Sequence, residues 1–207
     1  MRAVAIMVRI ATFATEIKKS IAMKRIILAI ACVASVLSLR AQESTFNEGN
    51  LVFNAGLGLG TTLYSGRHYS SFLPPISVSG EYGLIEDFIA EDITLGVGGY
   101  IGLAGAEYRF PASNWGWRYN YTVIGVRGAL HYPLVDKLDT YGGIMLGYNA
   151  VSVRDVGDVP SGFSSASGGL SLAIYLGGRY YFSERFGLMG EVGYGVSYLN
   201  IGVALKL

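Results

Sequence analysis

The sequence is poor in the residues that carry most enzymatic and metal chemistry. Its 207 residues include one cysteine, Cys32, and two histidines, His68 and His131. Cys32 lies in an apolar segment near the N-terminus, and the A-I-A that precedes it is a poor lipidation signal. If that segment is removed on export, the rest of the chain has no thiol, which excludes disulfides, cysteine nucleophiles and thiolate metal sites. We expect neither a cofactor nor a bound metal.

Long apolar runs and a strong charge are also missing from the larger part of the chain. From Gln42 to Leu207 no 18 consecutive residues are apolar, which excludes membrane-spanning helices. The same part holds nine Lys plus Arg and fourteen Asp plus Glu, so its net charge is 9 − 14 = −5. A mildly acidic surface argues against nucleic acid as a partner.

The first 41 residues have a different composition, with no glycine and seven of the sixteen basic residues. Met23-Lys24-Arg25 provides a positive start, residues 26–39 are apolar, and the small Ala41 suits cleavage before Gln42. These features predict a signal peptide over residues 23–41, an over-long gene assignment over residues 1–22, and a mature domain over residues 42–207. An uncleaved helical anchor is the alternative.

The mature chain is rich in glycine and in strict two-residue alternation. Alternating segments occur near residues 51–63, 76–84, 93–108, 119–132, 138–153, 170–182, 186–196 and 198–207. One face of each carries Leu, Ile, Val or Phe, and the other carries Gly, Ser, Ala, Asn or a charge. Because an eight-stranded bore is narrow, the small polar face suits the inside and the apolar face must meet lipid. We predict an all-β fold: a closed antiparallel eight-stranded transmembrane β-barrel, preceded by a cleaved signal peptide.

Five charged residues fall on the predicted inner face: Glu81, Arg127, Arg179, Glu191 and Lys206. Unpaired charges away from water are costly, and side chains meet across so narrow a bore. We predict a polar network that closes the lumen, in which Lys206 meets Glu191 or Glu81. The alternative is a selectivity lining for a narrow passive pore.

Aromatic residues gather near the predicted strand ends, with Trp115 and Trp117 toward one rim and Tyr180 and Phe182 toward the other. This distribution is typical of the two aromatic girdles at membrane–water interfaces. The alternative for Trp115 and Trp117 is contact with a sugar or a protein partner.

Enzymatic activity has weak support from the sequence. A triad could be formed on paper from His68, with Ser70 or Ser71 and with Asp155 or Asp158, but the spacing gives no support. His131 is predicted at the opposite side of the membrane. We predict that the protein is not an enzyme, with a lipid A modifying enzyme as the alternative. G-L-G-L-G opens no helix, so it is not a dinucleotide loop.

The C-terminal run R-Y-Y-F-S-E-R-F-G-L-M-G-E-V-G-Y-G-V-S-Y-L-N-I-G-V-A-L-K-L, residues 179–207, resembles the end of the small outer-membrane β-barrels of Gram-negative bacteria, of OmpA and OmpX type. The resemblance implies residence in the outer membrane, contact with its lipid and lipopolysaccharide, and a monomer. It also implies that the last strand is recognised by the barrel-assembly machinery, although Leu207 stands where that family usually has Phe. Such barrels share a shape rather than a site, so the resemblance implies no activity.

Overall fold

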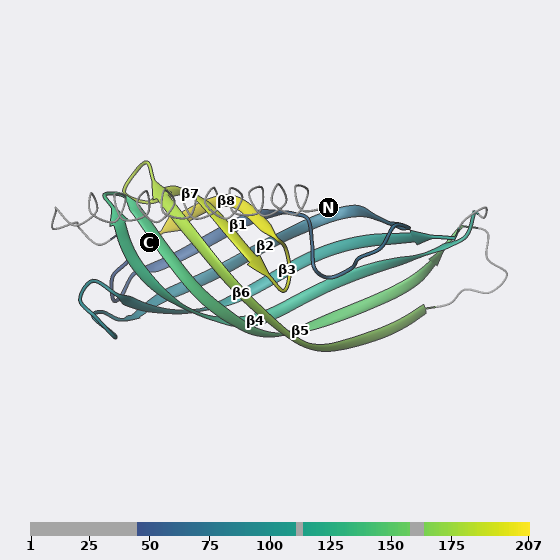
Figure 1. Ribbon diagram of the computed structural model, residues 1–207, viewed down its shortest axis with the longest axis horizontal. Helices are drawn as coiled ribbons and strands as arrows, with labels where there is room; N and C mark the ends of the chain where they lie inside the picture. Colours follow the sequence, from purple (N-terminus) through teal and green to yellow (C-terminus); the bar gives the residue numbers. More distant parts are fainter. Residues whose placement is uncertain (1–44, 111–113, 158–163) are drawn as a thin grey trace, which may run out of the picture. The chain divides into compact units, whose positions relative to one another are not determined.

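The protein forms a closed barrel of eight antiparallel strands in a computed structural model that describes residues 45–110, 114–157 and 164–207 (Figure 1). The predicted signal peptide and translation start lie outside these residues. The strands are β1 (Leu51–Leu59), β2 (Tyr69–Ile85), β3 (Thr94–Arg109), β4 (Gly116–Val135), β5 (Leu138–Val156), β6 (Ser164–Tyr181), β7 (Phe186–Tyr194) and β8 (Leu199–Lys206).

Each strand pairs with its neighbours in sequence, and β1 pairs with β8 to close the ring. The closing ladder runs from Val52 opposite Lys206 to Leu59 opposite Leu199. The start of β1 and the end of β8 therefore lie at one end of the barrel, which we call the terminal end. The predicted closed eight-stranded antiparallel barrel is confirmed.

The alternation of side chains is the one that the sequence predicts. Outward residues such as Val78, Ile124 and Leu172 are 56%, 58% and 67% exposed, whereas inward residues are buried. The ambiguous fifth segment is settled by its register, because Met145 is 2% exposed and faces inward while the adjacent Ile144 is 61% exposed. An apolar outer surface on every strand far exceeds what a protein exposes to water, so the barrel spans a lipid bilayer.

Within the described residues there is no helix with the length and hydrophobicity needed to cross a membrane.

Glycines on the inner face make room for large rings. A methyl group added to Gly177 would lie 2.6 Å from the Tyr141 ring, and one added to Gly143 would lie 2.6 Å from the Tyr175 hydroxyl. Both separations are far below van der Waals contact. The glycine-rich face therefore allows tyrosine and arginine side chains to fill a bore of eight strands.

The strands differ greatly in length, as Figure 1 shows. β1, β7 and β8 have 9, 9 and 8 residues, close to the number that crosses a membrane, whereas β2 to β6 have 16 to 20. The five long strands continue past the ends of the short ones, away from the terminal end. We call the continuing part the extension: residues 69–73, 104–109, 116–122, 149–156 and 164–169.

The outer face changes character where the extension begins. On β4 the outward series runs from Val126 and Ile124 to Thr122, Asn120 and Arg118. This change from apolar to polar marks the upper limit of the lipid-facing belt. It also explains why β2 and β6 begin at residues 69 and 164, several residues before the predicted 76 and 170, because the added residues lack the lipid-facing alternation.

Candidate functional site

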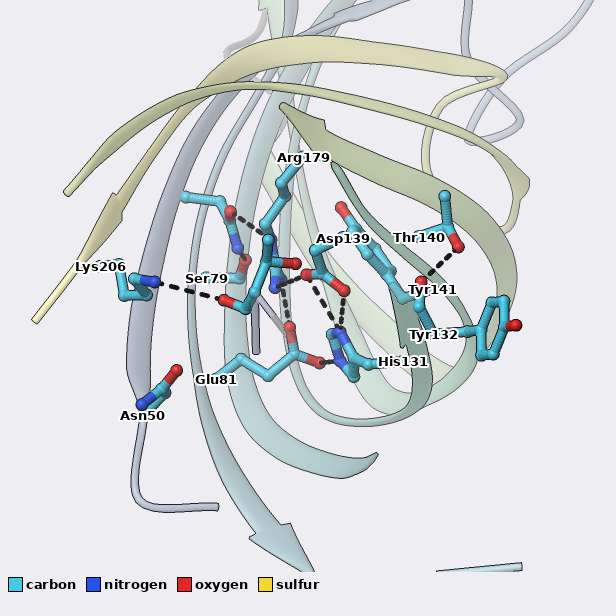
Figure 2. Close-up of polar contacts among 12 residues, drawn as sticks. Asn50, Ser79, Glu81, His131, Tyr132, Asp139, Thr140, Tyr141, Arg179 and Lys206 are labelled. Atoms are coloured by element: carbon cyan, nitrogen blue, oxygen red, sulfur yellow. Dashed lines mark hydrogen bonds and ion pairs between the residues drawn. The ribbon is translucent and has the colours of Figure 1, made fainter. Parts of the chain in front are cut away.

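The lumen near the terminal end is filled by a network centred on Arg179, whose side chain is 0% exposed. Its Nη1 donates to Asp139 Oδ2 at 3.0 Å, its Nε donates to Asn54 Oδ1 at 3.0 Å, and its Nη2 forms an ion pair with Glu81. Figure 2 shows Glu81 and Asp139 meeting Arg179 from separate strands. The guanidinium thus satisfies two carboxylates that face each other across the bore.

His131 joins the same two carboxylates from β4. Its Nδ1 lies 2.9 Å from Asp139 Oδ1 and its Nε2 lies 3.2 Å from Glu81 Oε1 (Figure 2). Both ring nitrogens are engaged and the side chain is 1% exposed. The imidazole therefore serves as a structural bridge with no nitrogen directed at solvent.

A second ion pair lies further along the bore, between Arg127 Nη2 and Glu191 Oε1 at 2.6 Å. The Tyr141 hydroxyl donates to the same Glu191 oxygen at 2.9 Å, and the Arg127 guanidinium lies 3.8 Å from the centre of the Tyr175 ring. Charge pairing and ring stacking together occupy the cross-section here.

A short segment before β1 covers the terminal end of this network. Phe46 is 2% exposed, and its ring stacks on His131 with centroids 4.0 Å apart. It belongs to an apolar cluster with Val52, Tyr181, Met189 and Ala204. The sequence gives no signal for this insertion, because residues 42–50 show no alternation.

Four of the five predicted lumen charges thus lie in buried ion pairs: Glu81, Arg127, Arg179 and Glu191. Asp139 and His131 complete the arrangement, and the spacing of the sequence did not single them out for it. Asp139 lies one residue after β5 begins, where a charge is ordinarily read as part of a turn.

Lys206 differs from its prediction. Its Nζ donates to the Thr45 carbonyl oxygen at 3.4 Å and lies 5.1 Å from the Tyr181 ring centre, rather than meeting Glu191 or Glu81. The register explains the missing contact with Glu191, which is opposite Asn200, six residues and roughly 20 Å along β8 from Lys206. Glu81 lies in the same row as Lys206, since both are opposite Val52, but its carboxylate oxygens are bound by Arg179 and His131. Lys206 therefore helps to hold the segment before β1.

The predicted girdle residues divide into two groups. Tyr180 and Phe182 are 51% and 60% exposed on the outer face near the terminal end. Trp115 and Trp117 are not in an equivalent outer girdle: Trp117 pairs with Tyr108 on the inner face, and Trp115 stacks on Phe110 at 4.4 Å. The prediction is wrong for the two tryptophans because β4 continues past the lipid, so its end does not mark the interface.

These tryptophans belong to a continuous aromatic cluster on the inner face of the extension. Ring contacts of 4.4–6.4 Å connect its members, which are Tyr64, Tyr69, Tyr108, Phe110, Trp115, Trp117, Tyr119 and Tyr121. Aromatic pairs at such separations add stability beyond their buried area. The cluster thus rigidifies a sheet that has no lipid around it.

The outer face of the extension carries an ion-paired group on β3 and β4. Glu107 is bound by Arg118 and by Arg109, the latter at 3.2 Å. The hydrogen bond from Arg118, more than any other contact, holds the pKa of the Glu107 carboxyl below its usual range. This group ties neighbouring strands together above the apolar belt.

The described residues of the hypothetical triad do not come together, and Asp158 lies outside the described residues. The His68 ring lies edge-on to Tyr108 at 5.9 Å, and Asp155 Oδ1 accepts a hydrogen bond from Trp115 Nε1 at 3.4 Å. His131 is enclosed in the lumen network. No arrangement of nucleophile and base is present among these residues.

Comparison with known proteins gives the following results. No family model matches the sequence, and no curated protein matches it. Similar solved structures include two of Ail, the attachment invasion locus protein of Yersinia pestis. The one in complex with the heparin analogue sucrose octasulfate has 12% sequence identity and a TM-score of 0.44, and the match covers 77% of this chain and 96% of that chain. The structure of Ail on its own has 14% identity and a TM-score of 0.43, and the match covers 77% of this chain and 95% of that chain. Another is the N-terminal β-barrel domain of Pseudomonas aeruginosa OprF, with 15% identity and a TM-score of 0.40, and the match covers 77% of this chain and 98% of that chain.

Proposed function

We propose that this chain is an integral outer-membrane protein with a closed lumen, and that it serves envelope structure or surface interaction through its extension and the adjoining loops. The observation that carries the proposal is the buried network of Arg179, Glu81, Asp139 and His131 beneath the Arg127–Glu191 pair. Charges paired in this way hold one another in place across the narrow bore, which favours a plug over a pore.

The orientation follows from the connections. The turn of residues 136–137 and that of residues 182–185 lie at the terminal end, as do the start of β1 and the end of β8. Short turns face the periplasm in outer-membrane barrels. The extension then projects outside the cell, where lipopolysaccharide surrounds its base. The last strand, β8, is the segment that the barrel-assembly machinery would recognise, and the protein is expected to be a monomer.

Fractionation and gel mobility test the first part of the proposal. The expressed protein should be found in the outer-membrane fraction and should migrate differently on a detergent gel before and after boiling. A protein that stays soluble in the periplasm, or that migrates identically in both states, would contradict it.

Planar-bilayer recording tests the closed lumen. The purified barrel should give no steady conductance. Stable single-channel openings would instead favour the narrow pore.

A mass shift of lipid A on expression would favour the lipid-modifying enzyme over a structural or interaction role.

A further inference from the structure

His131 and Arg179 connect the same two carboxylates into a closed cycle. Arg179 Nη1 donates to Asp139 Oδ2 at 3.0 Å, and Arg179 Nη2 forms an ion pair with Glu81 Oε2. From the other side, His131 Nδ1 lies 2.9 Å from Asp139 Oδ1, and His131 Nε2 lies 3.2 Å from Glu81 Oε1 (Figure 2). Every oxygen of the two carboxylates thus faces a nitrogen of His131 or Arg179.

This geometry determines how many protons the imidazole carries. A neutral imidazole has one N–H donor and one acceptor nitrogen, whereas an imidazolium has two donors. Both His131 nitrogens lie within hydrogen-bond distance of carboxylate oxygens, which only accept hydrogen bonds when ionised. A neutral ring would therefore point a lone pair at an ionised oxygen on one of its two sides. A doubly protonated ring satisfies both contacts.

The alternative position for the second proton is one of the two carboxyl groups. Arg179 opposes this position, because its guanidinium always carries its charge and its side chain is 0% exposed beside both groups. Protonation of either carboxyl would remove one of the two anions that compensate this buried cation. The imidazole is therefore the better place for the proton.

The charged and titratable groups around His131 come from three strands. They are Glu81 from β2, Asp139 and Tyr141 from β5, and Arg179 from β6. From β3, the neighbours Thr94 and Gly96 carry no charge. The Tyr141 hydroxyl donates to Glu191, outside the cycle. With the second proton on His131, two cations balance two anions. Without that proton the buried cycle has a net charge of −1, and an uncompensated buried charge is costly.

We infer that the second proton on His131 locks the segment before β1, residues 45–50, into the terminal end of the barrel. With the proton bound the cycle is balanced and the segment stays docked, whereas loss of the proton releases the segment. The inference deepens the proposed function, on which it rests, because it specifies what regulates the closure of the lumen. The docked state binds one proton more than the released state, so the lock weakens as the pH rises.

Phe46 transmits the change of charge to this segment. Its ring is 2% exposed, stacks on the His131 ring with centroids 4.0 Å apart, and lies 5.7 Å from the Arg179 guanidinium. An aromatic face attracts a cation, most strongly away from water, and a neutral His131 loses this attraction. The unbalanced carboxylate also attracts water, and the Arg127–Glu191 pair occupies the bore on the other side. Water therefore enters from the terminal end, where Phe46 lies in its path.

Two backbone hydrogen bonds report whether the segment is docked. The Gly49 N–H donates to the Gly83 carbonyl oxygen at 2.9 Å, and the Gly83 N–H donates to the Asn50 carbonyl oxygen at 2.9 Å. Both bonds break if the segment leaves β2. We call these two N–H groups the reporter amides. Their protection factors for hydrogen exchange, taken relative to the intrinsic exchange rate at each pH, measure docking.

Nitrogen NMR on the barrel in lipid nanodiscs tests the protonation of His131. The chain has two histidines, so selective labelling gives two sets of ring signals, and His68→Gln identifies the set from the exposed loop. At pH 7 both ring nitrogens of His131 should show a one-bond coupling to hydrogen. In Glu81→Gln the charges balance without the second proton, so one ring nitrogen should lose its hydrogen at the same pH.

Matched substitutions separate the effect of charge from that of ring stacking. His131→Gln removes both the imidazolium and its stacking contact, so the protection of the reporter amides should fall at least tenfold at pH 7. His131→Gln with Glu81→Gln also lacks the ring, but its charges balance, so most of the protection should return. His68→Gln should leave the protection unchanged. In the unsubstituted barrel, the protection should fall over the pH interval in which His131 loses its second hydrogen.

Three results would overturn the inference: a single N–H on His131 at pH 7, a double variant no better protected than His131→Gln, or loss of the second hydrogen with the protection unchanged. All variants must show the heat-dependent gel shift of the folded barrel, and if one does not, the measurements on the unsubstituted barrel decide. A protein that lacks the gel shift or leaves the outer membrane would refute the proposed function. A folded outer-membrane barrel whose segment stays docked without the proton would refute only this inference.

Discussion

Replacement of Arg179 by methionine should destabilise the barrel more than any other single change in the lumen. The arginine is fully buried and binds Glu81, Asp139 and Asn54. Methionine nearly fills the same volume but leaves both carboxylates without their shared cation. Removal of one partner from a buried ion pair costs about 3–5 kcal/mol, because the remaining charge is desolvated and uncompensated. We expect a loss in the free energy of unfolding within this range.

A second substitution should recover part of the loss. In Arg179→Met with Glu81→Gln, one of the two stranded charges is gone, and His131 still pairs with Asp139. The double variant should therefore be more stable than Arg179→Met alone, by about 1–3 kcal/mol, which is the cost of an unsatisfied buried group.

The assay is reversible urea unfolding in lipid vesicles, followed by tryptophan fluorescence and by the gel shift. Arg154→Met is the matched control, because Arg154 is exposed in the extension and its loss should change the unfolding free energy by less than about 0.5 kcal/mol. The reasoning would be refuted if Arg179→Met cost less than about 1 kcal/mol, or if the double variant were no more stable than the single one.

Three further predictions concern the lipid face, the terminal end and the extension. Val203→Arg, on an outward side chain that is 53% exposed, should cost about 2–4 kcal/mol or block assembly, as measured by the gel shift, whereas Val203→Ile should assemble normally. Phe46→Ala should cost about 3–5 kcal/mol in urea unfolding, because it removes a buried ring stacked on His131; a value near zero would mean that the segment before β1 is not docked. Because the pKa of Glu107 is lowered, its ionised carboxylate stabilises the folded extension at pH values above the ordinary glutamate pKa of about 4.3. This stabilisation should be lost as the pH falls through the lowered pKa of Glu107. The protection factors for amide exchange of residues 104–109, taken relative to the intrinsic exchange rate at each pH, should fall on acidification, and Glu107→Gln should abolish that fall.

Much of the architecture follows from local patterns. Period-two alternation along Leu170, Leu172 and Ile174 identifies an outward face without any knowledge of neighbouring strands, because side chains of a strand alternate between its two sides. The same rule places Glu81, Arg127 and Arg179 inside. It fails for Trp115 and Trp117, because alternation assigns a face but does not tell where lipid ends.

The pairing of particular residues depends on register, which the sequence leaves open. Lys206 and Glu191 share the inner face, yet the β7–β8 ladder separates them by six residues, so the expected contact does not form. Asp139 becomes a lumen residue only because β4 and β5 bring it beside His131. Strand ladders connect segments that are distant in the sequence, and no local pattern encodes which residues of two paired strands lie opposite each other.

The sequence by itself determined that this chain is a barrel of eight strands with an apolar outside and a charged, glycine-rich inside, because burial in lipid imposes a two-residue period on each strand separately. Only the tertiary structure decided which charges pair, that Phe46 covers the network, and that His131 lies between two carboxylates from different strands. These features depend on the relative lengths and registers of strands, which are set by contacts across the whole barrel.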